Sequence, residues 1–246
     1  MAAVTQDTQR ETIPTLQVSD IGPAIEILTT RYGFRLEMIV PADEPQSAIV
    51  SNNGKLLRLE SARMAKAGIG EDQIDARPLL FSRLNGTDQW HEGRAGMEYR
   101  DLIPGRMNGE CIASHIRIAN GGPTPDYVHY HKVSFQVIFC RSGWARLVYQ
   151  DQGPPFVLEP GDCVLQPPEI RHRVLETSPG FEVIEVGSPA VHETWVDHDL
   201  LLPENETTTE DASRSHPDKR RIDSGQPFLW HRSSEANWRR NPDGLE

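Results

Sequence analysis

The first sixty residues combine a strand-like spacing of apolar positions with a helical one. Residues 16–20 alternate apolar and polar side chains, as a half-buried strand does. Asp20 can cap a following helix, and Gly33 is placed to end it. Three strand-like runs follow, the last two separated by an Asn-Gly turn pair: 34–40, 47–51 and 56–60. The pattern predicts the order strand, helix, strand, strand, strand for residues 12–60.

Residues 97–202 consist of short runs rich in β-branched side chains and bounded by Gly or Pro. The runs are 112–118, 135–140, 145–149, 156–158, 163–166, 172–175 and 181–186. Many short strands at such intervals are typical of an antiparallel sandwich or barrel. We therefore expect a mainly β protein whose barrel is preceded by a smaller α+β unit.

The other segments have little apolar periodicity. They are a flexible N-terminus at 1–11, a connector at 61–96, a disordered linker at 203–226 and a tail at 227–246. In the tail, Trp238 precedes a Gly-apolar-Glu triplet at the same offset as Trp90, which lies just before the barrel. The repeat suggests the start of a second barrel unit, with coincidence as the alternative.

Composition and charge narrow the range of partners. The 246 residues include 36 Asp and Glu against 25 Lys and Arg, a formal net charge of −11. Nucleic-acid binding needs a basic surface, so we expect no such partner. No run approaches the roughly 18 apolar residues of a membrane span, and the polar N-terminus does not resemble a secretion signal. The 3 widely spaced cysteines fit reduced thiols in the cytoplasm.

The sharpest chemical signal is the pair His129 and His131. Residues i and i+2 of a strand point to the same face, so both imidazoles would face the barrel interior. His172, from a later strand, can complete a set of neutral nitrogen ligands. Such a facial set leaves coordination positions open for substrate or dioxygen, as a catalytic metal site requires.

The spacing around these histidines resembles the two motifs of the cupin superfamily of RmlC-like β-barrel proteins. The first motif follows His-x-His with a ligand carboxylate and then a glycine. Here Gln136 stands at the carboxylate position and Gly143 at the glycine position. In the second motif, Gly161 and a Pro-x-Gly-like turn precede His172, with Glu169 in place of the turn glycine. The resemblance covers about 97–189 and implies an antiparallel jelly-roll barrel.

The resemblance also implies a divalent metal on His129, His131 and His172, with Gln136 as a candidate fourth ligand. Three-histidine cupins are typically Fe(II)-dependent, so Fe(II) is the favoured metal, with Mn, Ni or Zn as alternatives. The favoured function is a non-haem Fe(II) dioxygenase acting on a small organic acid, phenol or diketone. The alternatives are a ligand-binding or sensory cupin without turnover, and a metal-dependent isomerase or lyase.

Further polar side chains are candidates for a small-molecule substrate pocket, although the face that each strand presents is open at this point. They are His115, Cys140, Tyr149, Gln166 and Arg171. The stretch 189–202 either packs over the barrel end or acts as a lid that turns a polar group toward the substrate.

Residues 12–60 resemble one βαβββ module of the glyoxalase and extradiol dioxygenase superfamily, through L-x-V-x-D at 16–20 and Y-G-F at 32–34. That superfamily has a metal-binding histidine where this chain has Ile13, although Glu60 occupies the usual place of a carboxylate ligand. A full site needs two modules. We therefore expect a structural role, either packing on the barrel or pairing with a second chain in a homodimer.

Overall fold

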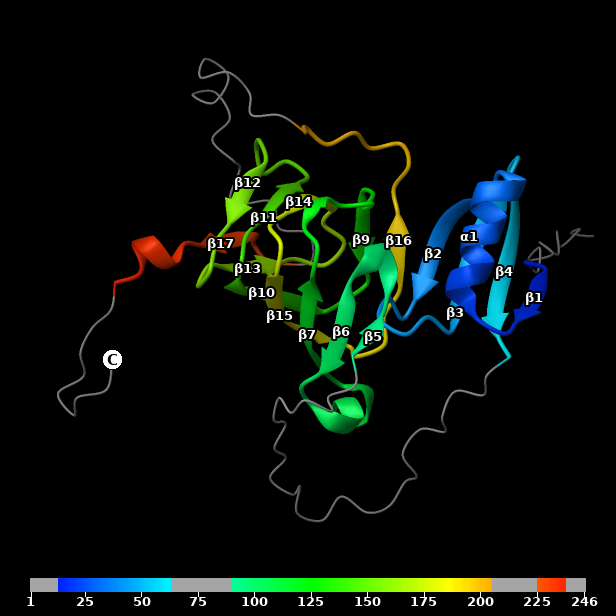
Figure 1. Ribbon diagram of the computed structural model, residues 1–246, viewed down its shortest axis with the longest axis horizontal. Coiled ribbons are helices and arrows are strands. Elements are labelled where there is room, and N and C mark those ends of the chain that lie inside the picture. The colour runs from blue at the N-terminus through cyan, green and yellow to red at the C-terminus, as the bar shows by residue number, and fades with distance from the viewer. Residues whose placement is uncertain (1–12, 63–89, 205–224, 238–246) are drawn as a thin grey trace, which may run out of the picture.

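Figure 1 shows a computed structural model that describes residues 13–62, 90–204 and 225–237. The expected flexible N-terminus and most of the expected connector and linker lie outside these residues. The described part is mainly β, and its barrel has the expected jelly-roll arrangement of two facing sheets. The predicted fold class is therefore confirmed.

The N-terminal unit has the predicted order of elements. They are β1 (Thr15–Val18), α1 (Ile21–Tyr32), β2 (Arg35–Val40), β3 (Ser47–Asn52) and β4 (Lys55–Ser61). Helix α1 begins where the Asp20 carboxylate accepts a hydrogen bond from the Gly22 N–H at 3.2 Å. It ends at Gly33, which adopts φ 69° and donates its N–H to the Leu28 carbonyl.

Helix α1 covers one face of a sheet in the order β1-β4-β3-β2, in which β1 and β4 are parallel. Ile21 of the helix packs with Ala48, Val50 and Leu59 of the sheet in one buried core. This sheet does not end at β2, because β2 pairs with β16 (Thr194–Val196) of the barrel. The N-terminal unit and one wall of the barrel therefore share a continuous sheet (Figure 1).

The barrel part of that sheet has the order β16-β9-β14-β11-β12, with β8 paired to β14. Its other strands are β8 (Gly122–Pro123), β9 (His129–His131), β11 (Ala145–Tyr149), β12 (Phe156–Leu158) and β14 (His172–Thr177). Most of these match predicted runs, whereas β8 and β16 were not predicted. Both are too short to show an alternating pattern of their own.

The facing sheet has the order β17-β13-β10-β15-β7-β6-β5. Its strands are β5 (His91–Glu92), β6 (Glu98–Asp101), β7 (Ile112–Ile118), β10 (Phe135–Ser142), β13 (Cys163–Gln166), β15 (Phe181–Ser188) and β17 (Leu229–His231). Short 3-10 turns are η1 (Arg94–Gly96), η2 (Pro104–Gly109) and η3 (Ser233–Glu235). Apolar side chains from both sheets, including Ile116, Leu147 and Leu158, fill the space between them.

The described part of the tail joins this same barrel. Strand β17 pairs antiparallel with β13 and extends the edge of the sheet. Phe228 is buried in the barrel core, and the Trp230 ring stacks on Phe156 with 4.0 Å between centroids. The predicted start of a second barrel unit at Trp238 lies outside the described residues.

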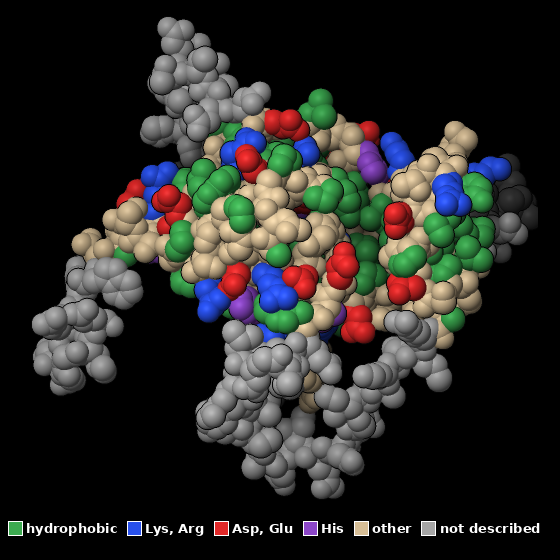
Figure 2. Space-filling view, in the orientation of Figure 1, with side chains coloured by type: hydrophobic (Ala, Val, Ile, Leu, Met, Phe, Trp, Pro, Cys, Tyr) green, Lys and Arg blue, Asp and Glu red, His purple; other side chains and the backbone are tan. Residues whose placement is uncertain are grey.

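Acidic and basic side chains are intermingled over the face of the molecule seen in Figure 2. Among the described residues, no helix combines the length and the apolar character needed to cross a membrane.

Candidate metal centre

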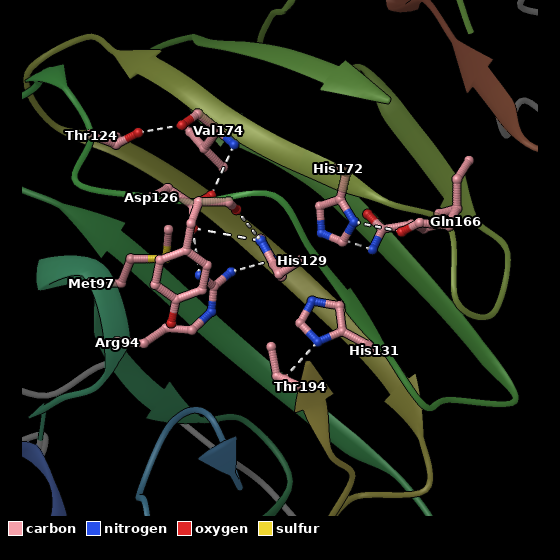
Figure 3. A network of polar contacts seen from close by, with 12 residues as sticks. Arg94, Met97, Thr124, Asp126, His129, His131, Gln166, His172, Val174 and Thr194 are labelled. Atoms are coloured by element: carbon pink, nitrogen blue, oxygen red, sulfur yellow. Dashed lines mark hydrogen bonds and ion pairs between the residues drawn. The ribbon is translucent and has the colours of Figure 1, made fainter. Parts of the chain in front are cut away.

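Two neighbouring strands bring the three predicted histidines together. His129 and His131 are the first and third residues of β9 and therefore share one face of the strand. His172 begins β14 directly opposite His129 in the antiparallel register. One ligand nitrogen from each ring lies within 4.8 Å of the others, and all three residues are buried. Figure 3 shows the three imidazoles converging on one point inside the barrel. Within the described residues, this is the one such cluster of potential metal ligands.

Each of these imidazoles is held through its Nδ1 atom. His129 Nδ1 lies 2.8 Å from the Tyr127 carbonyl, and His172 Nδ1 lies 2.9 Å from the Ile170 carbonyl. A carbonyl oxygen only accepts, so both Nδ1 atoms carry the proton and both Nε2 atoms are unprotonated, each with a lone pair that can accept a hydrogen bond or bind a metal. His131 Nδ1 lies 2.8 Å from the Thr194 hydroxyl, across the β9–β16 pairing. This arrangement orients the rings as metal-ligating histidines are usually oriented.

Burial keeps all three rings neutral. Loss of solvation lowers the pKa of His172 to about 4, and it lowers the pKa values of His129 and His131 well below the ordinary value for histidine. The neutral ring is the form that binds a metal. The donor set therefore fits a divalent ion and could hold one at neutral pH.

The turns around the triad explain how the sequence departs from the cupin motifs without losing the fold. Glu169 adopts φ 61°, the left-handed conformation usual for the glycine it replaces, and donates its N–H to the His131 carbonyl. Gly143 has φ 68°, and an added Cβ there would lie 2.5 Å from the Ser178 hydroxyl. Only glycine fits at position 143 without a clash, whereas Glu169 adopts a strained backbone conformation at its position.

Gln136 lies beside the triad, and its amide oxygen accepts one hydrogen bond. Gln166 donates from Nε2 to Gln136 Oε1 at 2.9 Å and contacts His172 Nε2 at 3.2 Å. The Tyr149 hydroxyl donates to Gln166 Oε1 at 2.8 Å. An amide oxygen has two lone pairs, so the single hydrogen bond from Gln166 still leaves Gln136 able to serve as a fourth ligand. Among the predicted pocket residues, Tyr149 and Gln166 thus adjoin the triad.

Arg94, in the segment predicted to be a connector, reaches the triad from η1. Its Nη1 pairs with Asp126 Oδ1 at 2.7 Å, and its Nη2 lies 2.6 Å from His129 Nε2 (Figure 3). Burial by itself lowers the pKa of Arg94, but Asp126 and neighbouring groups raise it by more. The pKa therefore lies above the ordinary value for arginine, and the guanidinium stays charged. Asp126 is fixed in turn by the Val174 N–H at 2.9 Å.

A cavity of about 80 Å³ opens beside the triad, with room for several water molecules or a small organic molecule. Its wall is largely apolar and includes Met97, Ile112, Ile116, Ile138, Leu147, Val174 and Phe181. The N-terminal unit contributes Ala42 and Asp43 from the loop between β2 and β3. The cavity is thus closed in part by the unit that precedes the barrel.

Two acid–base side chains on the cavity wall were not among the predicted site residues. Glu185 lies on β15, and burial raises its pKa despite the opposing effects of His192 and Gln136. His192 comes from the segment before β16, and its ring stands edge-on to His131 with 5.5 Å between centroids. The stretch 189–202 therefore does turn a polar group toward the cavity. A sequence signal for Glu185 was that it shares strand parity with the apolar Phe181 and Val183 of β15.

Three predicted pocket residues lie elsewhere. Ser114 and Ile116 of β7 face the cavity, so His115 between them points to the other face, where its Nε2 lies 2.9 Å from Glu182. Arg171 pairs with Asp197 at 3.1 Å outside the barrel. Cys140 packs in the hydrophobic core, where burial raises its pKa to about 11.

The N-terminal unit shows no comparable centre in its described part. Glu60 accepts a hydrogen bond from Gln17 at 2.9 Å and belongs to no cluster of potential metal ligands among the described residues. Ile13 offers no ligand atom.

Comparison with known proteins agrees with the barrel geometry. Residues 114–186 match the protein family described as the Cupin domain. This part of the chain is a cupin domain. No curated protein is detectably similar to the chain in sequence.

Solved structures that match part of this chain include an RmlC-like cupin from Shewanella frigidimarina, which is 25% identical in sequence. The match covers 46% of this chain and 93% of that cupin, with a TM-score of 0.36. KdgF from Halomonas sp. is 20% identical, covers 43% of this chain and 92% of its own, and has a TM-score of 0.35. Oxalate decarboxylase from Bacillus subtilis is 16% identical and covers 42% of this chain but 28% of its own, with a TM-score of 0.33. The family assignment rests on the match of residues 114–186.

Proposed function

We propose that this cupin is a metal-dependent enzyme, and specifically a non-haem Fe(II) dioxygenase acting on a small organic acid, phenol or diketone. The observation that carries the proposal is the triad itself. Its three rings are buried, neutral and held through Nδ1, with the opposite nitrogens turned to a common point beside a cavity. Purely structural sites usually provide four protein ligands, whereas catalytic sites usually provide three.

In this proposal His129, His131 and His172 hold the ion, which would supply Lewis-acid or redox chemistry at the edge of the cavity. The apolar side chains of the wall bind the body of the substrate and exclude water. Fe(II) is the proposed metal, with Mn, Ni or Zn as alternatives that use the same nitrogen ligands.

The second candidate is a metal-dependent isomerase or lyase, and a specific observation favours it. Glu185 and His192 line the same cavity, and a buried carboxyl group with a raised pKa is suited to proton transfer near neutral pH. In this reaction class the two side chains would move a proton to or from a substrate carbon or oxygen. No oxygen would be consumed.

Metal analysis combined with oxygen uptake tests the proposal. Protein purified under anaerobic conditions should contain stoichiometric iron and consume oxygen with a member of a panel of phenols, carboxylic acids and diketones. His131→Ala should lose the metal and the activity, because it removes one of three ligands. His198→Ala is the matched control, because His198 contacts the Leu36 carbonyl at 2.8 Å outside the cavity.

Other outcomes separate the candidates. Bound metal with proton exchange or elimination, but without oxygen uptake, would support the isomerase or lyase. Protein that takes up none of Fe, Mn, Ni or Zn would contradict both metal-dependent candidates and leave the ligand-binding cupin.

A further inference from the structure

Arg94 and a metal ion would both bind the Nε2 atom of His129. The Nη2 group of Arg94 lies 2.6 Å from His129 Nε2, and His129 Nδ1 carries the ring proton because it faces the Tyr127 carbonyl. The lone pair on Nε2 therefore accepts the guanidinium hydrogen bond. A neutral imidazole has a single such lone pair, so it cannot bind a metal at the same time.

The guanidinium is built into this position. The Arg94 side chain is 8% exposed, and its partner Asp126 is completely buried and anchored by the Val174 N–H. The preceding Gly93 allows the close approach of the chain, since an added Cβ there would lie 2.5 Å from the Tyr99 ring. Ala95 follows with φ 55°, another sign that the turn is specifically shaped.

We propose that Arg94 competes with the metal: it occupies His129 in the metal-free protein and must be displaced when a divalent ion binds. This inference rests on the proposed function in that it takes the triad as the metal site. It goes further by assigning Arg94, which is not itself a ligand, a role in setting metal affinity and the rate of metal uptake.

The geometry of the pair explains how displacement can occur without unfolding the site. Asp126 holds Arg94 through Nη1, whereas His129 is contacted through Nη2. A lysine at position 94 would keep the charge beside Asp126 but has one terminal nitrogen in place of the two-pronged guanidinium. Arg94→Lys therefore separates loss of the His129 hydrogen bond from loss of positive charge.

The test uses the full-length metal-free protein and Co(II), with calorimetry for affinity and stopped-flow absorbance for rates. Arg94→Lys should bind Co(II) about tenfold more tightly than the wild type, because no charge-assisted hydrogen bond has to be broken. Arg117→Lys is the matched control, since Arg117 pairs with Glu98 at 2.9 Å and does not line the cavity. Its affinity should equal that of the wild type.

Binding kinetics test the same inference without a variant. If Arg94 must leave first, the observed rate for the wild type should reach a plateau as the Co(II) concentration rises. A rate that rises linearly throughout, or equal affinities for wild type and Arg94→Lys, would overturn the role of Arg94 and leave the metal site intact. Failure of both proteins to bind Co(II) would instead overturn the metal site, and the Arg94 inference with it.

Discussion

At the scale of single residues, the triad depends on hydrogen bonds at Nδ1 that fix the orientation of each ring. Two of the three Nδ1 partners are backbone carbonyls, which side-chain substitutions leave in place. The third is the Thr194 hydroxyl, which is completely buried. His131 is therefore the ring whose orientation depends most directly on a neighbouring side chain.

Replacing Thr194 with valine tests this dependence. Thr194→Val keeps the shape of the side chain but removes the oxygen, and partners of this kind typically change metal affinity about tenfold to a hundredfold. We expect weaker Co(II) binding of that order in a calorimetric titration. Thr194→Ser keeps the hydroxyl and should bind as the wild type does. Equal affinity in Thr194→Val would show that packing alone orients His131.

At the scale of elements, the short strand β16 has two neighbours. On one side it pairs with β9, which carries His129 and His131, and on the other side with β2 of the N-terminal unit. Met38 of β2 lies opposite Trp195 at this junction and is 2% exposed. Strand β16 therefore links the N-terminal unit to β9, the strand that carries two histidines of the triad.

Truncating Met38 should weaken the whole molecule. Met38→Ala removes a buried side chain, and such changes lower the free energy of unfolding by about 2 to 5 kcal/mol. Urea denaturation measures the effect. Leu16→Ala is the control at an edge strand where the side chain is 45% exposed, and it should change stability by about 0.5 kcal/mol or less. A similarly small change for Met38→Ala would mean that the junction contributes little.

At the scale of the whole molecule, a partly buried charge cluster joins the N-terminal unit to the second sheet. Asp43, in the loop after β2, pairs with Arg106 of η2, and its Oδ2 lies 3.8 Å from His91 Nε2 of β5. Arg106 also contacts Asp101 at 3.0 Å. Asp43 lines the cavity as well, so this contact between the units lies at the proposed substrate site.

The cluster predicts a pH dependence of stability. Asp43 raises the pKa of His91 above its ordinary value, so folding is stabilised by the charged ring. That contribution is complete below the pKa of the unfolded chain, near 6.5, and is lost as the pH rises through the higher folded-state value. The difference in thermal stability between wild type and His91→Gln should therefore shrink above about pH 6.5.

The triad histidines make the opposite contribution to the pH dependence of stability. Because His91→Gln leaves the triad unchanged, that contribution cancels in the difference between wild type and variant. The triad histidines have lowered pKa values and therefore destabilise the fold as the pH falls below about 6.5. A difference that is constant from pH 5.5 to 8.5 would contradict the role of His91.

Much of the fold was predictable from sequence because its signals are local. The short runs at 112–118 and 145–149, rich in β-branched side chains and bounded by Gly or Pro, gave strands with the observed bounds, and Asp20 and Gly33 marked the ends of α1. The strands that escaped prediction, such as β16 and β17, have three residues each. Their extended conformation depends on partners distant in sequence, so no local pattern reveals it.

The sequence by itself determined the jelly-roll barrel and the three converging histidines, because alternation along β9 puts i and i+2 on one face and the motif spacing brings in His172. Only the tertiary structure decided what surrounds them. Strand register turned Ser114 rather than His115 to the cavity, and packing of distant segments brought Arg94 and Asp43 to its wall. Side-chain alternation is a property of the local backbone, whereas the contacts of a loop depend on the entire fold.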